Sequence, residues 1–136
     1  MKRLWVILFV VLIFSCEDND EPNNMVICAS GIMTINIAKD STITGSWDIV
    51  GVNSFTEKDI GPQIGKGQLD GYIKDGKIQL NMNPKIADNN IFLNGNYSNE
   101  NIIGNWHLSV FRASGNSPSG SFEINNQNKY TAYINE

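Results

Sequence analysis

The stretch GQLDGYIKDGKIQLNMN, residues 67–83, decides the fold, because it reads as two alternating strands around a turn. Asp75-Gly76 suits a two-residue hairpin, since both positions tolerate a positive φ. Side chains alternate between the two faces of a strand. One face of the hairpin therefore carries Leu69, Gly71, Ile73, Ile78, Leu80 and Met82. This pattern predicts an antiparallel β-hairpin with one apolar face.

Similar segments lie on both sides of this hairpin and are separated by Gly, Asn and Asp, which is typical of an all-β chain. No helical period of useful length is present after residue 24. We expect strands over residues 31–38, 45–52, 68–74, 77–83, 91–97, 102–111, 121–125 and 130–134, with loops over residues 55–66 and 113–120. The sequence therefore predicts an all-β domain of about eight strands.

A short pattern recurs in these segments: Gly, any residue, then an apolar or aromatic residue. It occurs as Gly45-Ser46-Trp47, Gly95-Asn96-Tyr97 and Gly104-Asn105-Trp106. A strand Gly permits a sharp bend, and a nearby aromatic side chain can cover the gap. Regular bends and short antiparallel connections predict an up-and-down meander that forms a small closed or partly open barrel. A two-sheet β-sandwich is the alternative, because it fits the same strands.

The Gly-x-Trp at residues 45–47, with Gly-rich hairpins after it, resembles the calycin group of lipocalins and avidin-like barrels over residues 45–125. Aromatic residues line the ligand pocket in the avidin-like members. The resemblance therefore implies that Trp47, Tyr97 and Trp106 form the wall of a site for a small apolar or glycan-like ligand. The alternative is that these inward aromatic side chains are simply core.

The amino-terminal stretch MKRLWVILFVVLIFSC, residues 1–16, has two cations, an apolar run and a cysteine. The apolar run is shorter than the roughly 20 residues that span a bilayer, so residues 1–15 predict a secretory signal peptide. Ile13-Phe14-Ser15-Cys16 resembles the lipobox of bacterial lipoproteins. That resemblance implies cleavage before Cys16, lipidation of Cys16, and the membrane as a partner through this lipid. A signal peptide followed by a chance cysteine is the alternative.

Residues 16–24 predict a solvated tether, because Glu17-Asp18-Asn19-Asp20-Glu21 is acidic and too poor in apolar residues to fold. The position of this run after Cys16 resembles the acidic export signal of Bacteroidota surface lipoproteins. We expect an outer-membrane lipoprotein, with the cell surface and the periplasmic face both open. Residues 25–136 then form a single domain.

The charge balance argues against nucleic acid as a partner. The chain has 14 acidic and 10 basic residues. Loss of the leader, with its two cations, leaves a net charge of −6, and the tether accounts for four of the acidic residues. Nucleic-acid binding needs cations that replace released counterions, and the remaining body is near −2.

The sequence favours a protein without catalysis, cofactor or metal. A Ser–His–acid triad needs a histidine, and the only one, His107, lies on an outward-facing strand position. It also lacks companions for a zinc site. Cys28 fits a buried strand residue. Asp48, Asp70 and Glu123 lie on expected strands, and paired carboxylates of this kind keep a hydrolase as a third alternative.

Asp40-Ser41-Thr42 resembles the three-residue O-glycosylation acceptor of Bacteroidota proteins outside the cytoplasm. The motif falls in an expected turn, where Ser41 is accessible. The resemblance implies Ser41 as a modification site.

Two functions fit these features. The first is a lipid-anchored binding module that holds a small ligand within or at the mouth of the barrel. The second is a structural or protein-interaction accessory of an envelope complex, with a filled core and a docking outer face.

We expect Cys16→Ser to abolish lipidation, because the acceptor thiol is lost. Metabolic labelling with a radioactive fatty acid, followed by membrane fractionation, measures this. Cys28→Ser is the matched control and should keep the label. Acyl label on the Cys16→Ser protein would contradict the leader assignment.

Overall fold

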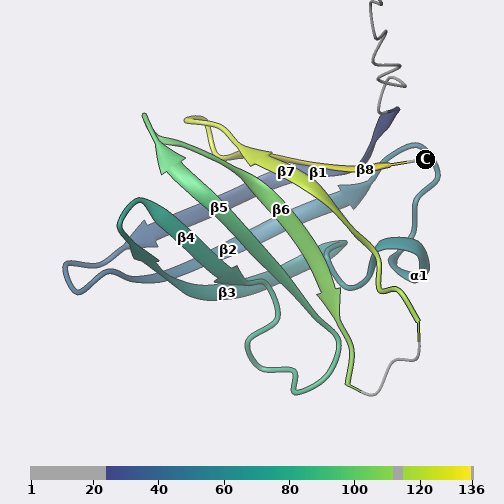
Figure 1. Cartoon of the computed structure of the whole chain (residues 1–136), viewed down its shortest axis with the longest axis horizontal. Coiled ribbons are helices and arrows are strands. Elements are labelled where there is room, and N and C mark those ends of the chain that lie inside the picture. Colours follow the sequence, from purple (N-terminus) through teal and green to yellow (C-terminus); the bar gives the residue numbers. More distant parts are fainter. Residues whose placement is uncertain (1–23, 112–114, 136) are drawn as a thin grey trace, which may run out of the picture.

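The computed structural model describes residues 24–111 and 115–135, which form a closed antiparallel β-barrel (Figure 1). Cys16 and the predicted signal peptide and tether lie outside the described residues, apart from residue 24. The elements are β1 (Met25–Ile37), β2 (Thr42–Gly51), α1 (Glu57–Ile60), β3 (Gly65–Lys74), β4 (Lys77–Asn81), β5 (Asn90–Ser98), β6 (Asn101–Ser109), β7 (Ser119–Ile124) and β8 (Lys129–Asn135).

Each strand pairs with the next along the chain, and β8 returns to pair with β1. This last pairing runs from Met25 opposite Asn135 to Ile32 opposite Lys129, with a bulge between Ile27 and Ala29. The predicted all-β meander of eight strands is confirmed. The closed ladder excludes the sandwich alternative.

The hairpin predicted at residues 67–83 is also confirmed. Asp75 and Gly76 have φ values of 52° and 73°, as a two-residue turn of this kind requires. Lys74 lies opposite Lys77, and Ile73 lies opposite Ile78. Because register follows from the turn, the apolar side chains of both strands face the barrel interior.

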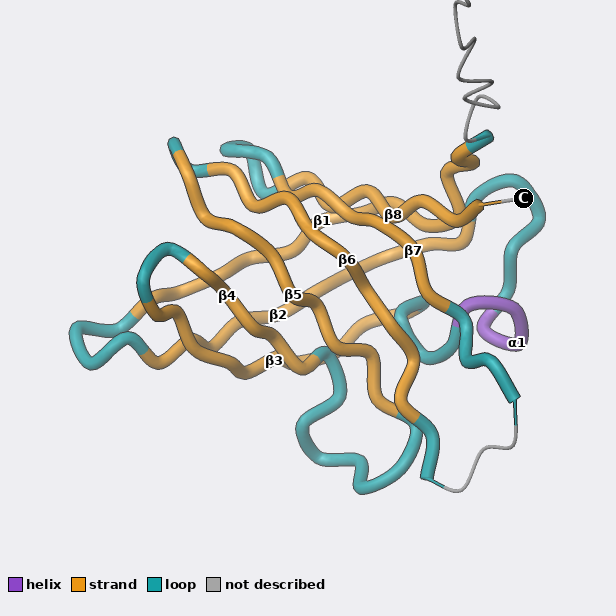
Figure 2. The backbone as a smooth tube through the Cα atoms, viewed as in Figure 1, coloured by secondary structure: helices purple, strands orange, loops and turns teal. Residues whose placement is uncertain are grey.

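The two ends of the barrel differ, as Figure 2 shows. Short turns join β1 to β2, β3 to β4, β5 to β6 and β7 to β8 at one end, here called the turn end. The other end, here called the loop end, carries the longer connections over residues 52–64 and 82–89, and the described residues 110–111 and 115–118 between β6 and β7. The only helix among the described residues, α1, lies in the first of these connections.

This connection differs from the loop predicted over residues 55–66, because it contains α1 and β3 begins earlier, at Gly65. The Asp59 carboxylate accepts hydrogen bonds from the Thr56 backbone N–H at 2.8 Å and the Thr56 hydroxyl at 2.7 Å. These bonds lower the pKa of Asp59 and hold the first turn of α1. The Thr-x-x-Asp spacing was the signal that the loop prediction missed.

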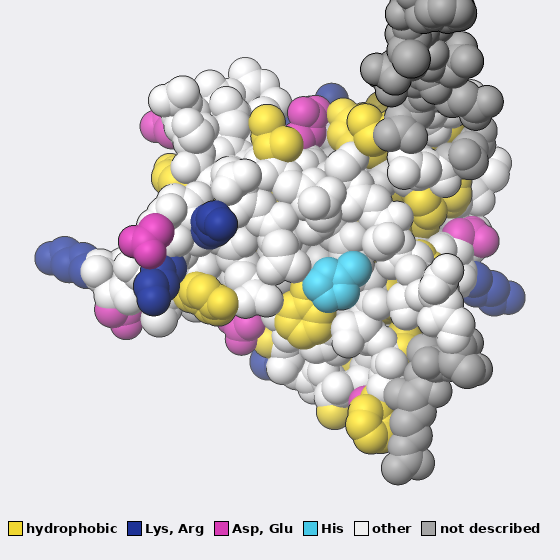
Figure 3. Space-filling view, in the orientation of Figure 1, with side chains coloured by type: hydrophobic (Ala, Val, Ile, Leu, Met, Phe, Trp, Pro, Cys, Tyr) yellow, Lys and Arg dark blue, Asp and Glu magenta, His cyan; other side chains and the backbone are white. Residues whose placement is uncertain are grey.

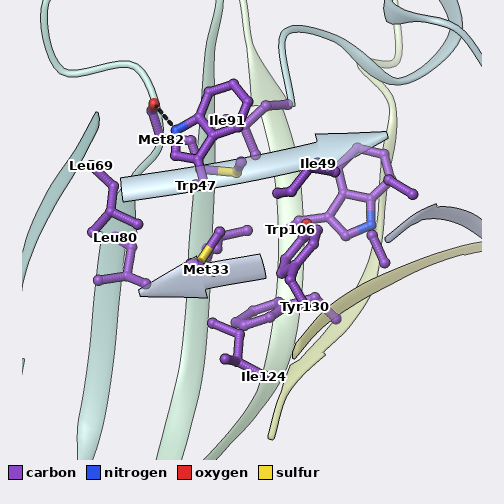
Figure 4. Packing of buried hydrophobic residues seen from close by; sticks show 14 of the residues in the cluster. Met33, Trp47, Ile49, Leu69, Leu80, Met82, Ile91, Trp106, Ile124 and Tyr130 are labelled. Atoms are coloured by element: carbon purple, nitrogen blue, oxygen red, sulfur yellow. Dashed lines mark hydrogen bonds between the residues drawn. The ribbon is translucent and has the colours of Figure 1, made fainter. Parts of the chain in front are cut away.

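Inward-facing side chains fill the barrel. The largest fully buried ones include Trp106, Tyr130, Phe122, Met33 and Leu93. Figure 4 shows Met33 lying among Trp47, Trp106 and Tyr130. Cys28 is fully buried on β1, as predicted. In the part of the chain that the structure describes, no helix has the length and apolar character needed to cross a membrane.

Gly104 should tolerate no side chain, because it lies opposite Gly95 in the β5–β6 ladder. A Cβ there would overlap the Asn94 carbonyl oxygen and the Gly95 Cα. We expect Gly104→Ala to lower the free energy of unfolding by about 2 kcal/mol, measured by urea denaturation. Asn105→Ala, one residue along and exposed, is the control and should change it by less than about 0.5 kcal/mol. Equal stability of the two variants would contradict this close packing.

Candidate functional site

The two predicted tryptophans of the ligand wall belong to the packed interior. Trp106 is fully buried, and its Nε1–H donates to the Tyr133 carbonyl oxygen at 3.0 Å. Trp47 is nearly as buried, and its Nε1–H donates to the Met82 carbonyl oxygen at 2.9 Å, drawn as a dashed line in Figure 4. Both indole donors are thus satisfied by the protein backbone, and Trp106 presents no surface to a ligand.

The third predicted residue, Tyr97, lies at the rim of the turn end and is 37% exposed. It borders a hollow of about 270 Å³ together with Ile37, Glu100 and Asn126. Trp47 instead borders a hollow of about 250 Å³ at the loop end. The three aromatic residues are therefore not brought together around one pocket: two lie at opposite ends and Trp106 lies in the core.

Hydrogen bonds of buried polar side chains close the loop end of the barrel. Gln63 is fully buried, and its Oε1 accepts a hydrogen bond from the Tyr130 hydroxyl at 2.8 Å while its Nε2 donates to the Ile60 carbonyl oxygen at 2.9 Å. Asn83 donates to the Pro62 carbonyl oxygen at 3.0 Å. These bonds join β8 and the residue 82–89 connection to the segment that follows α1, so the segment acts as a plug.

The residues considered for chemistry lie apart from one another on the outside. His107 is exposed and stacks on Phe92, with ring centroids 5.5 Å apart. Asp48 forms an exposed ion pair with Lys66 at 2.8 Å, which raises the pKa of Lys66. Glu123 accepts a hydrogen bond from the Tyr133 hydroxyl at 3.0 Å. Among the described residues, no three His, Cys, Asp or Glu side chains gather as a metal site would require.

Ser41 lies in the β1–β2 turn, with a φ of 70° and an exposed side chain. The neighbouring Asp40 Oδ1 accepts hydrogen bonds from the Thr42 hydroxyl at 2.6 Å and the Thr42 backbone N–H at 3.1 Å, which lower the pKa of Asp40. These bonds fix the turn and leave Ser41 outside. Glycosylation of Ser41 stays a prediction, as does lipidation of Cys16.

Sequence reasoning missed a hollow on the outer face of β3–β6. Its volume is about 690 Å³, and outward polar side chains line it, among them Tyr72, Gln79, Asn94, Asn96 and Asn105. In Figure 3 the middle of this face, over β5 and β6, is mostly white, which marks uncharged polar side chains and backbone. Alternation within each strand predicts which of these side chains point outward. The sequence does not predict which of them are neighbours across strands, because that depends on the register between strands.

The chain matches no protein-family model, no curated protein and no solved structure. The resemblance to calycins therefore stays a prediction. The site has to be judged by the chemistry of its own residues.

The buried thiol of Cys28 predicts a loss of stability in alkali. Burial raises the pKa of Cys28 from 9.0 to about 11, and its protonated Sγ donates to the Ala132 carbonyl oxygen at 3.4 Å. Above pH 9 the unfolded thiol loses its proton while the folded one keeps it, so stability falls as pH rises. Tyr130, whose pKa burial also raises, adds to the loss above pH 10.

Urea midpoints measured at pH 8, 9 and 10 test this. Between pH 9 and 10 we expect a decline in the wild type and a shallower one in Cys28→Ala. Parallel declines in the two proteins would mean that Cys28 is not the cause.

Proposed function

We propose that this protein is a lipid-anchored module of the bacterial cell envelope that performs no catalysis and binds its partner on the outside of the barrel. The observation that carries the proposal is the filled interior. An eight-stranded barrel is about wide enough either to be filled by side chains or to hold one small ligand. Here Trp106, Tyr130 and Phe122 occupy that space.

The closed loop end supports the same reading. Ile60 and Gln63, both in the β2–β3 connection, are fully buried, and the Tyr130 hydroxyl holds Gln63 in place. A ligand that entered from this end would have to break this buried hydrogen bond and displace side chains from a close-packed core. Together these two steps would cost several kcal/mol of free energy. A partner on the outer face has neither cost.

The proposed localisation of the protein depends on its amino-terminal leader. The lipobox-like residues 13–16 support an outer-membrane anchor through a lipid on Cys16, with residues 16–24 as an acidic tether. Stable anchoring of a soluble domain needs more than one acyl chain, which bacterial lipoproteins carry. The barrel would then stand close to the membrane surface, where envelope partners lie.

A second candidate is a small apolar ligand at the loop end, close to the first function expected from the sequence. The hollow of about 250 Å³ there favours it, because Trp47, Ile64, Met82 and Ile86 give it an apolar lining. Lys66 and Lys85 lie at the same hollow. A ligand for this hollow would be small and would carry a negative charge, because two lysines border the hollow.

Titration of the full-length protein with 1-anilinonaphthalene-8-sulfonate tests the filled interior. The probe is apolar and anionic, and it fluoresces when it leaves water. We expect no saturable fluorescence increase for the folded protein at micromolar concentrations.

Saturable binding that Trp47→Phe weakens, with Trp106→Phe unaffected, would favour the second candidate. Saturable binding that Trp106→Phe weakens would contradict the filled interior and, with it, the proposal of binding on the outside.

A further inference from the structure

The outer face of β3–β6 carries one cross-strand row of polar residues. Tyr72 lies opposite Gln79, Gln79 lies opposite Asn94, and Asn94 lies opposite Asn105. We call these four residues the amide row. All four border the hollow of about 690 Å³. With neighbouring strands about 4.8 Å apart, the row runs for about 14 Å around the barrel.

The half of the row that Asn94 and Asn105 form is uncharged, and its hydrogen-bonding groups are unused. Asn94 and Asn105 are exposed, and their amides bond to no other described residue. Asn96, beside them on β5, has the same properties. Each amide offers two donor hydrogens and an acceptor oxygen. The charged residues of the hollow, Lys74, Asp75 and Lys77, lie towards the β3–β4 turn.

Tyr72 lies at one end of the row, and its aromatic ring is partly exposed and held in one orientation. It is 52% exposed, and its hydroxyl donates to Gln79 Oε1 at 2.5 Å. This bond orients the ring before any ligand arrives, which lowers the entropy cost of binding. A second hollow of about 220 Å³ begins on the same two residues and reaches Phe92, the ring that stacks on His107. Aromatic surface therefore borders the amides on two sides.

We propose that the amide row binds a neutral oligosaccharide or polysaccharide. Hydroxyl groups both donate and accept, so they match amides that would otherwise lose water without compensation. The apolar C–H face of a pyranose ring matches the exposed face of Tyr72. This inference rests on the proposed function, since it names the partner class for binding on the outer face.

A protein partner fits this face less well. Protein interfaces depend on aromatic or arginine anchors that lie in desolvated pockets at their centre. The centre of this face is a group of free amides, and its aromatic rings lie at the border. By contrast, the outer face of β1–β3 carries exposed Ile32 with the Asp48–Lys66 ion pair around its own hollow. That mixture is nearer to an ordinary protein-contact surface.

Native electrophoresis in gels that contain a polysaccharide tests the inference with the full-length protein. The detergent should carry no sugar head group, for example lauryldimethylamine oxide. The probes are soluble glucans, mannan, galactan and xylan as neutral polymers, with polygalacturonate as an acidic one. We expect at least one neutral polymer to retard the wild type.

Asn94→Ala and Asn105→Ala should each weaken that binding about tenfold, the loss expected for one or two hydrogen bonds to a ligand. Tyr72→Ala should weaken it at least as much. Asn36→Ala is the matched control, because Asn36 is an exposed asparagine on the outer face of β1, and it should bind like the wild type.

Two results would overturn the inference: no retardation by any neutral polymer, whether or not polygalacturonate retards the protein, or equal weakening by Asn94→Ala and Asn36→Ala. Neither of them contradicts binding on the outside as such, which the dye titration tests separately. The dye titration therefore shows whether the interior binds a ligand, and the gel assay shows whether the ligand of the outer face is a neutral saccharide.

Discussion

The pairing of β8 with β1 is the constraint on which the rest of this structure depends. Without it, the meander would be an open sheet with two unpaired edges and one apolar face in water. With it, the sheet encloses a space, and every inward residue has to fit that space. The bulge between Ile27 and Ala29 lies within this pairing. A bulge adds one residue to one strand, so the register of β1 against β8 shifts by one residue at this point.

Filling the enclosed space determines where the protein can bind. The two indoles and the Tyr130 ring occupy the centre, and their polar atoms find partners inside the protein: Tyr133 and Met82 carbonyl oxygens for the indoles, and Gln63 for the phenol. The donors of these three rings are therefore unavailable to a ligand, and among the described residues Asn90 Oδ1 is the one buried side-chain polar atom without a partner. The outer face differs, because Asn94 and Asn105 hold unused hydrogen-bonding groups in a hollow.

Local sequence patterns predicted much of the fold. The Asp75-Gly76 turn, the inward alternation of Leu69 and Leu80 and the outward position of His107 follow from two-residue periodicity and turn chemistry, and the structure has all of them. The early start of β3 and the short helix α1 were not predicted. Both depend on contacts, since a helix this short is held by the Thr56–Asp59 bonds and the burial of Ile60.

By itself, the sequence determined the all-β class, the approximate strand number and which side chains share a face, because each depends on neighbours one to four residues apart. Only the tertiary structure decided that the meander closes, that Trp47 and Trp106 are core while Tyr97 stands at a rim, and that Tyr72, Gln79, Asn94 and Asn105 form one row. These facts depend on register between strands. Register is set by closure and by how the enclosed side chains fit together, and both are properties of the whole barrel.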